Sequence, residues 1–278
     1  MPSDPFAFCE DLVRRIDFDR YLSALFAPER ARRHLFALYA FNYEVAKTAE
    51  SVTQPVAGQI RLQWWRDAIA EICAGNARAH EVASALAAVI NEHRLPQILF
   101  DALIDAREND LAESPFTTIA EWEAYADATS GHLMRLAARI LGGGDSWDDV
   151  ARHAGIALSF TGLLRAVPFH AARERVMLPA ELLESARVSE RDLLSGRMSE
   201  NISALIARVT QITRNHLDAA KTPRVPRALL PALLPAALVP LYLSAMTRSG
   251  FDPFCDSTEA PVHRRQLAML KAMIRGRL

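Results

Sequence analysis

The chain has 278 residues, of which 50% are hydrophobic and 23% charged, with 32 basic and 33 acidic residues and a formal net charge of -1. So much apolar material is typical of a globular protein with a sizeable core. The balanced charge lacks the basic excess of nucleic-acid binders, so no nucleic-acid partner is expected. The three cysteines are far apart and form neither a disulfide framework nor a zinc-binding spacing.

Helical periodicity dominates the chain, and the alternation typical of half-buried strands is nearly absent. The breaks between helices are short and none resembles an interdomain linker, which favours one all-α domain over residues 1–278. Met177–Ser199 is the most irregular stretch and is expected to contain one short helix. The predicted helices, in chain order, are Ala31–Thr48, Gln59–Cys73, Glu81–His93, Gln97–Ala112, Ile119–Leu141, Trp147–Val167, Ser199–Ala220, Pro226–Thr247 and Val262–Arg275.

The stretch Leu229–Met246 is almost wholly apolar and approaches the ~20 residues that a membrane span needs. Pro231, Pro235 and Pro240 interrupt it, and each removes a backbone donor, which favours a buried core segment over a membrane helix. Docking on a membrane surface is the alternative. Acidic side chains near the N-terminus fit neither a secretory signal nor a transit peptide. We expect a cytoplasmic protein, with contact at the periphery of the inner membrane left open.

Two stretches resemble the squalene/phytoene synthase family, the head-to-head condensing enzymes of the isoprenoid synthase fold. They are Ala31–Val52 (ARRHLFALYAFNYEVAKTAESV) and Gly155–Leu183 (GIALSFTGLLRAVPFHAARERVMLPAELL). The second follows the family's order of Leu-Leu-Arg, an acidic motif, Arg-x-Arg and a hydrophobic-Leu-Pro step. The segment Leu95–Leu111 also sits in family order. The resemblance covers about residues 21–243 and implies an all-α, single-domain helical bundle of the isoprenoid synthase type.

Enzymes of this family ionise a diphosphate with Mg²⁺ held by two Asp-x-x-x-Asp motifs on facing helices. Carboxylates at positions i and i+4 share one helix face, and Mg²⁺ prefers hard oxygen ligands. Here the resemblance places the first motif on Ala46 and Glu50 and the second on Ala166 and His170. One carboxylate of four remains, which implies that these positions are not catalytic and that no Mg²⁺ cofactor is bound.

Three segments are more similar to the mitochondrial complex I assembly factors that derive from this fold. They are Arg20–Val52, Ile60–Ile69 (IRLQWWRDAI) and Arg165–Pro179 (RAVPFHAARERVMLP). Those proteins likewise have an Ala-Phe-Asn-x-Glu run in place of the first aspartate motif. The resemblance implies a pseudoenzyme that works by binding, with a subunit or assembly protein of a respiratory complex as its expected partner.

Basic residues gather near the former active site. The candidates for binding an anion or a lipid headgroup are Arg165, Arg173, Arg175 and Lys47. Arginine suits phosphate because its planar fork of donors binds two oxygens at once; surface salt bridges and helix C-terminal compensation are the structural alternative. Glu44 and Tyr43 are candidates for a polar cavity, although Glu44 can also pair with Lys47 at three-residue spacing.

Two other functions stay open. An active prenyl transferase, condensing farnesyl or geranylgeranyl diphosphate, would need Asp101, Asp105 and Glu50 as replacement Mg²⁺ ligands converging on one point. Asp101 and Asp105 share a helix face, but a solvated acidic face explains them equally. A binder of an isoprenoid, a polyprenyl phosphate or another lipid would keep the hydrophobic tunnel and hold the headgroup with the basic group.

Overall fold

The computed structural model describes residues 4–52, 54–221 and 224–278. Its N-terminal half is built, in chain order, from α1 (Pro5–Ile16), α2 (Phe18–Ala24), α3 (Glu29–Ala46), the 3₁₀ turn η1 (Lys47–Glu50), α4 (Pro55–Cys73), α5 (Glu81–His93), α6 (Gln97–Ala106), the 3₁₀ turn η2 (Arg107–Leu111), α7 (Ile119–Ala126), the π-helical turn η3 (Asp127–Gly131) and α8 (His132–Ile140).

The C-terminal half continues with helices of very different length. They are the 3₁₀ turn η4 (Asp145–Trp147), α9 (Asp148–Arg165), α10 (Val167–Ala171), α11 (Ala180–Ser185), α12 (Glu190–Leu194), α13 (Glu200–Lys221), α14 (Leu230–Leu233), the 3₁₀ turn η5 (Leu234–Leu238), α15 (Val239–Met246) and α16 (Val262–Arg275). The predicted all-α class is confirmed, since these elements are all helical in the described part of the chain.

Two helices precede the first one predicted from the sequence. Aspartates begin both: the side chain of Asp4 accepts from the backbone N–H of Phe6, and that of Asp17 accepts from the N–H of Arg20. Such caps satisfy donors that a helix start leaves free. The omission of α1 and α2 was therefore wrong, and the missed signal was the pair of capping aspartates.

Several predicted helices are correct in place but are divided or shortened. The predicted Ile119–Leu141 helix is interrupted by the π-helical turn η3, and the predicted Gln97–Ala112 helix tightens into η2. Met177–Ser199 holds two short helices, α11 and α12, instead of one. The predicted helices Ala31–Thr48 and Trp147–Val167 are shorter at their C-terminal ends than expected. The corresponding helices α3 and α9 end at Ala46 and Arg165, because the backbone changes its winding at the residues that follow.

The apolar stretch Leu229–Met246 is largely buried, as predicted, but it forms α14, η5 and α15 instead of one helix. Its three prolines lie at the second position of these pieces, where a missing backbone N–H costs least. Among the described residues, no helix combines the length and the apolar character that crossing a membrane requires.

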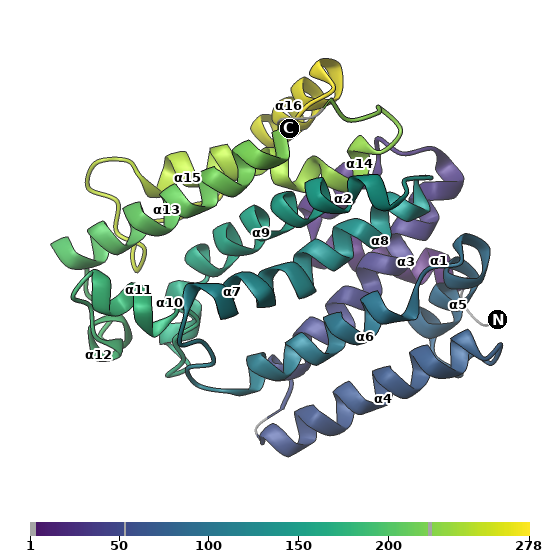
Figure 1. The fold of residues 1–278 in the computed structure, drawn as a ribbon, viewed down its shortest axis with the longest axis horizontal. Helices are drawn as coiled ribbons and strands as arrows, with labels where there is room; N and C mark the ends of the chain where they lie inside the picture. The colour runs from purple at the N-terminus through teal and green to yellow at the C-terminus, as the bar shows by residue number, and fades with distance from the viewer. Residues whose placement is uncertain (1–3, 53, 222–223) are drawn as a thin grey trace.

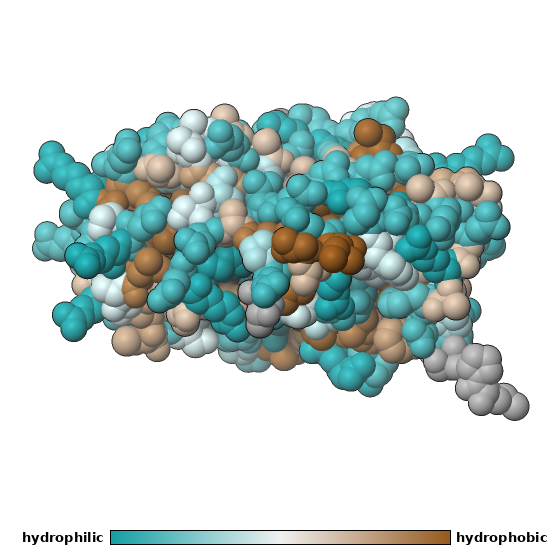
Figure 2. Space-filling view, turned by 90° about the horizontal axis from the view of Figure 1, so that it is seen from below, coloured by the Kyte–Doolittle hydropathy of each residue, from teal (hydrophilic) through white to brown (hydrophobic). Residues whose placement is uncertain are grey.

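The buried side chains form two clusters. One joins α1, α3, α4, α5, α6 and α8, and the other joins α7, α9 and the helices that follow it, with Leu141 packed against both. Figure 1 shows α13 beside α9 on the upper side of the molecule and α4 at its lower edge. The face seen from that edge is mostly hydrophilic, with separate hydrophobic patches (Figure 2); α4 carries the exposed Val56 and Ile60.

Candidate functional site

A cleft opens where the ends of α3 and α9 approach η2 and η3. It consists of two adjoining hollows of about 260 and 370 Å³. Both are lined by Ala46, Arg107, Ser130, Ser159 and Gly162. The π-helical turn η3 contributes Ser130 to both, in keeping with the frequent use of such turns at functional sites.

The four positions that the family resemblance assigns to metal binding come together in the first hollow. Its lining includes Ala46, Glu50, Ala166 and His170. Ala46 and Ala166 present methyl groups, which cannot ligate a cation. Glu50 is exposed and has no hydrogen-bond or ion-pair partner among the described residues.

The backbone at both motifs departs from the regular α-helix. α3 ends at Ala46, and Lys47–Glu50 continue as a 3₁₀ turn. α9 ends at Arg165, and α10 then begins with Pro168 in its first turn. Residues four apart are rotated by about 40° in an α-helix but by about 120° in a 3₁₀ helix, which has three residues per turn. Side chains at 46 and 50 therefore do not share one helix face.

Arg173 and Arg175 line the first hollow without a carboxylate partner. Arg173 is exposed, lies 3.7 Å from the ring centre of Phe169, and donates to the Phe169 carbonyl at 3.4 Å. Arg175 donates to the backbone carbonyls of Ala112 and Asp110. Their charges are therefore not neutralised by an acid within the described residues, and they give this hollow a positive character.

Arg165 belongs to the second hollow instead. Its guanidinium lies 3.9 Å from the ring centre of Tyr242 and donates to the Thr258 hydroxyl at 2.9 Å. Glu259 lies 3.7 Å from it and is largely exposed. A cation stacked on an aromatic face is held in place without losing its charge. Arg165 therefore lines a different hollow from Arg173 and Arg175, and its side chain contacts the segment that precedes α16.

Lys47 and Glu44 pair with each other, at 2.5 Å between Nζ and Oε1. The ammonium also lies 4.9 Å from the ring centre of Tyr43. Neither Lys47 nor Glu44 is among the residues that line the two hollows, whereas Tyr43 lines the second. The structure therefore places Tyr43 at the cleft and leaves the roles of the other two as predictions.

A buried trio closes the base of the first hollow. Nη1 of Arg107 donates to Oδ2 of Asp110 and to the Tyr125 hydroxyl, both at 3.0 Å, and that hydroxyl donates to Oδ1 of Asp110 at 2.6 Å. Burial raises the pKa of Tyr125, so its hydroxyl stays protonated. Sequence reasoning missed this trio: the Arg107–Asp110 spacing hints at a pair, but nothing local predicts Tyr125.

Two acids of the second hollow are also engaged. Asp17 accepts from Arg20 at 2.5 Å. Asp19 accepts from the Tyr242 hydroxyl and pairs with Arg265 at 2.8 Å, which ties α2 to α15 and α16. The charge of each carboxylate is therefore already compensated by the cation beside it.

His170 lines the first hollow together with Arg173, Arg175 and the trio. Burial, together with the nearby charge of Arg175, lowers the pKa of His170 to about 4. Its Nδ1 is buried and has no hydrogen-bond partner among the described residues. Near neutral pH the imidazole is therefore uncharged.

Asp101 and Asp105 lie on α6 and are not among the residues that line the cleft. Asp105 pairs with Arg66 at 2.7 Å, and burial raises the pKa of Asp101. Asp101, Asp105 and Glu50 do not converge: among the described residues, the one set of three metal-ligating side chains in mutual reach lies elsewhere, between α3 and α5. The geometry that a replacement Mg²⁺ site requires is thus not formed.

Comparisons with known proteins show which family and which relatives this chain resembles. The squalene/phytoene synthase family profile matches residues 13–267. A complex I assembly factor 6 from Rattus norvegicus is 32% identical over 92% of this chain and 78% of its own length. A phytoene synthase from Thermus thermophilus is 28% identical over 92% of this chain and 88% of its own.

The fold is also that of a solved dehydrosqualene synthase. The two structures align with a TM-score of 0.85 at 17% identity, covering 97% of this chain and 95% of the other. The predicted isoprenoid synthase architecture is therefore confirmed. With a profile that matches nearly the whole length and a fold that agrees, this chain belongs to the squalene/phytoene synthase family.

Proposed function

We propose that this protein is a non-catalytic member of its family that assists the assembly of respiratory complex I or a related membrane complex. It would work from the cytoplasm, at the periphery of the inner membrane. In this role the cleft binds a ligand or partner and performs no bond-breaking step. The observation that carries the proposal is that Ala46, Ala166 and His170, which occupy positions that the resemblance assigns to carboxylates, line one hollow together with Arg173 and Arg175.

The residues of the cleft do not fit the Mg²⁺ ions that catalysis in this family would use. The first hollow offers two carboxylates, Glu50 and Asp110, and Asp110 is already bound to Arg107 and Tyr125. The resemblance assigns four carboxylates, in two Asp-x-x-x-Asp motifs, to holding these ions, and Mg²⁺ prefers hard oxygen ligands. Here the free carboxylate is a single exposed side chain, and the arginines of the same hollow would repel the ion.

The comparisons support the assembly role. Relatives named complex I assembly factor 6, from Rattus norvegicus and Homo sapiens, are 32% and 31% identical to this chain, against 28% for the phytoene synthase from Thermus thermophilus. Each match covers more than nine-tenths of this chain. The similarity therefore extends over the whole fold instead of resting on one motif, and it is greater toward the assembly factors.

One observation favours a second candidate, a binder of a polyprenyl phosphate or a lipid headgroup. Arg173 and Arg175 carry charges without a carboxylate partner, and the imidazole of His170 stands beside them. An anion there would receive charge-assisted hydrogen bonds without a metal. The small space that shares Leu163 and Met177 with this hollow holds only about 10 Å³, so an acyl or prenyl chain would need side chains to move.

The first experiment tests for turnover. The purified protein is incubated with Mg²⁺ and radiolabelled farnesyl or geranylgeranyl diphosphate, and released pyrophosphate and extracted hydrocarbons are measured. We expect no product above a heat-denatured control, with an active phytoene synthase as the positive control. Pyrophosphate release that requires both Mg²⁺ and native protein would refute the non-catalytic assignment.

The second experiment tests the assembly role. The gene is deleted in the source organism, and assembled complex I is quantified in membranes by native electrophoresis and by rotenone-sensitive NADH oxidation. We expect both to fall and to recover when the wild-type gene is restored. Unchanged complex I in the deletion strain would contradict an assembly function while leaving anion binding by the cleft untouched.

A further inference from the structure

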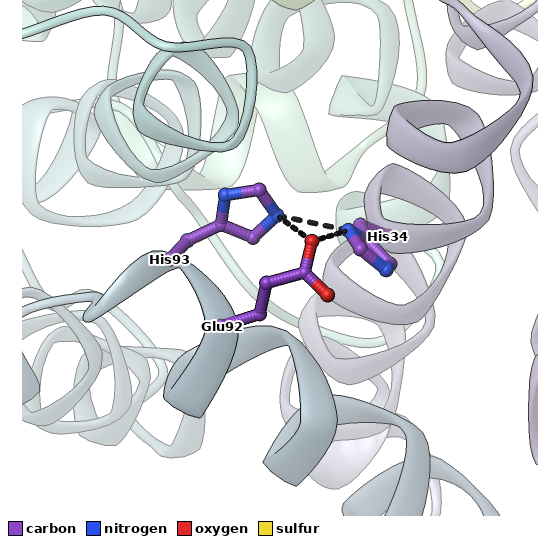
Figure 3. Close-up of side chains that lie close together, drawn as sticks. All are labelled: His34, Glu92 and His93. Carbon is purple, nitrogen blue, oxygen red and sulfur yellow. Dashed lines mark hydrogen bonds and ion pairs between the residues drawn. The ribbon is translucent and has the colours of Figure 1, made fainter.

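Two histidines and a glutamate meet between α3 and α5, outside the cleft. His34 lies in the second turn of α3, whereas Glu92 and His93 are the last two residues of α5. Arg94 ends that helix in the left-handed conformation, at φ 50°. Figure 3 shows the three side chains pointing toward one another across the junction of the helices.

Their ligand atoms form a compact triangle. Nδ1 of His34 lies 2.8 Å from Nε2 of His93, and Oε1 of Glu92 lies 3.8 Å from the first nitrogen and 3.7 Å from the second. Ligands of a tetrahedral Zn²⁺ site, with bonds of about 2.0–2.1 Å, are separated by ~3.3 Å. Movements of about half an ångström in each side chain would bring the three atoms to that spacing.

The surroundings suit a metal ion. The His34 side chain is 9% exposed and that of His93 is 19% exposed, so water is partly excluded from the histidines. Burial lowers the pKa of both imidazoles, which keeps them in the neutral form that binds metals. Arg30 pairs with Oε2 of Glu92 at 3.0 Å and leaves Oε1 facing the histidines. Such an outer partner fixes the orientation of a ligating carboxylate.

A second histidine pair in the same molecule provides an internal comparison. His153 and His216 also approach each other, at 2.9 Å between their Nδ1 atoms. Their acidic neighbours lie at the opposite ring nitrogens: Glu123 is 3.3 Å from Nε2 of His216, and Asp149 is 3.7 Å from Nε2 of His153. The carboxylates of this pair therefore do not converge with the close nitrogens, as Glu92 does with His34 and His93.

We propose that His34, Glu92 and His93 form a binding site for a divalent transition-metal ion of the zinc type, which links α3 to α5. Two imidazoles and one carboxylate are a common Zn²⁺ ligand set, and the fourth position would be filled by water. The ion would fix the end of α5 against the start of α3, in the half of the fold that also holds α1. This site is independent of the proposed role of the cleft.

The test uses the full chain purified without a histidine tag. Zn²⁺ binding is measured by calorimetry, and bound metal is counted by mass spectrometry after dialysis against Zn²⁺ and then against metal-free buffer. We expect one Zn²⁺ per chain. His93→Gln, and separately Glu92→Gln, should weaken binding by at least ~100-fold, because losing even an outer partner of a ligand costs 10- to 100-fold.

His153→Gln is the matched control, since it removes a histidine from the other pair and should leave Zn²⁺ binding unchanged. Co²⁺ gives a second readout, because a tetrahedral site with nitrogen ligands produces visible absorption that His93→Gln should abolish. Thermal unfolding with and without Zn²⁺ shows whether each variant folds and whether the ion stabilises it. Equal Zn²⁺ binding by wild type and His93→Gln, or equal loss in His153→Gln, would overturn the proposal.

Discussion

Gly155 of α9 crosses Gly131 of η3 so closely that a β-carbon at residue 155 would lie 2.4 Å from the backbone nitrogen of Gly131. The obstructing atoms belong to the backbone, so they cannot rotate away. Gly155→Ala should therefore separate α9 from η3 and destabilise the fold by about 1–3 kcal/mol, the usual cost of overpacking. The unfolding midpoint in urea measures this effect.

Gly162, also on α9, is the matched control. A β-carbon there would meet nothing within 4 Å. Gly162→Ala should leave stability unchanged or raise it by about 0.4–1 kcal/mol, because alanine restricts the unfolded chain more than glycine does. A Gly155→Ala protein as stable as Gly162→Ala would show that the crossing can relax at no cost.

The carboxylate of Asp110 compensates the charge of Arg107 at the base of the cleft, where their side chains are 12% and 15% exposed. Asp110→Ala leaves that guanidinium without its acid and the Tyr125 hydroxyl without its acceptor. Removing one partner of a buried pair costs about 3–5 kcal/mol. We expect a loss of this order in the free energy of unfolding, measured in urea.

Asp105→Ala serves as the comparison for that loss. Asp105 also pairs with an arginine, Arg66, but its side chain is 62% exposed. An exposed pair contributes at most about 1 kcal/mol. Similar losses in the two variants would mean that burial does not strengthen the Arg107–Asp110 pair.

Because of His170, the free energy of unfolding should decrease as the pH falls. Its folded-state pKa of about 4 lies below the ~6.5 of an unfolded histidine, because burial and Arg175 disfavour the charged imidazolium. The stabilisation is present above pH ~6.5 and is lost as the pH falls toward 4. Between these values the wild type should lose more unfolding free energy than His170→Gln does.

His263→Gln controls for the general effect of removing a histidine, since His263 is exposed on α16. Its stability should follow the wild-type curve over the same pH range. If His170→Gln also follows that curve, the imidazole of His170 does not resist protonation in the folded protein.

The proposed anion binding by the first hollow should depend on Arg173. Because this side chain is exposed and has no acid partner among the described residues, Arg173→Gln should fold normally. Hydrogen bonds to charged groups contribute about 1.5–3 kcal/mol, so pyrophosphate affinity should fall by about tenfold or more. Calorimetric titration with pyrophosphate in the absence of Mg²⁺ measures it.

Arg191→Gln is the control for net charge, because Arg191 is an exposed arginine on α12 that is not part of the cleft lining. It should bind pyrophosphate as the wild type does. An equal loss in Arg191→Gln would assign the binding to general electrostatic attraction. No pyrophosphate binding by the wild type would refute an anion site in this hollow.

Much of the fold follows from local signals in the sequence. The helices at Glu81–His93 and Val262–Arg275 have the predicted bounds, and the capping box predicted from Thr118 and Glu121 is present at the start of α7. Periodicity did not reveal η3, because a single π-helical turn inside a helix is rare and too short to give a pattern of its own. Gly131 at its end packs closely against Gly155 of α9, a tertiary contact that no local pattern indicates.

The site was less predictable than the fold. The family resemblance indicated that Ala46 and Ala166 belong to one site, and both line the first hollow. Partners distant in sequence escaped prediction: Tyr125 joins Arg107 and Asp110, and His34 meets His93, which is 59 residues away. Pairing of this kind is set by how helices dock, and a single sequence carries no pattern for it.

The 3₁₀ winding of Lys47–Glu50 would make the proposed loss of catalysis difficult to reverse by side-chain substitution alone. Aspartates restored at 46 and 50 would diverge around the chain axis, so a reversion confined to side chains would not rebuild a chelating pair. A chelating pair at these positions would also require this turn to adopt the α-helical winding of α3. The winding of Lys47–Glu50 thus limits metal chelation at this position independently of which side chains stand there.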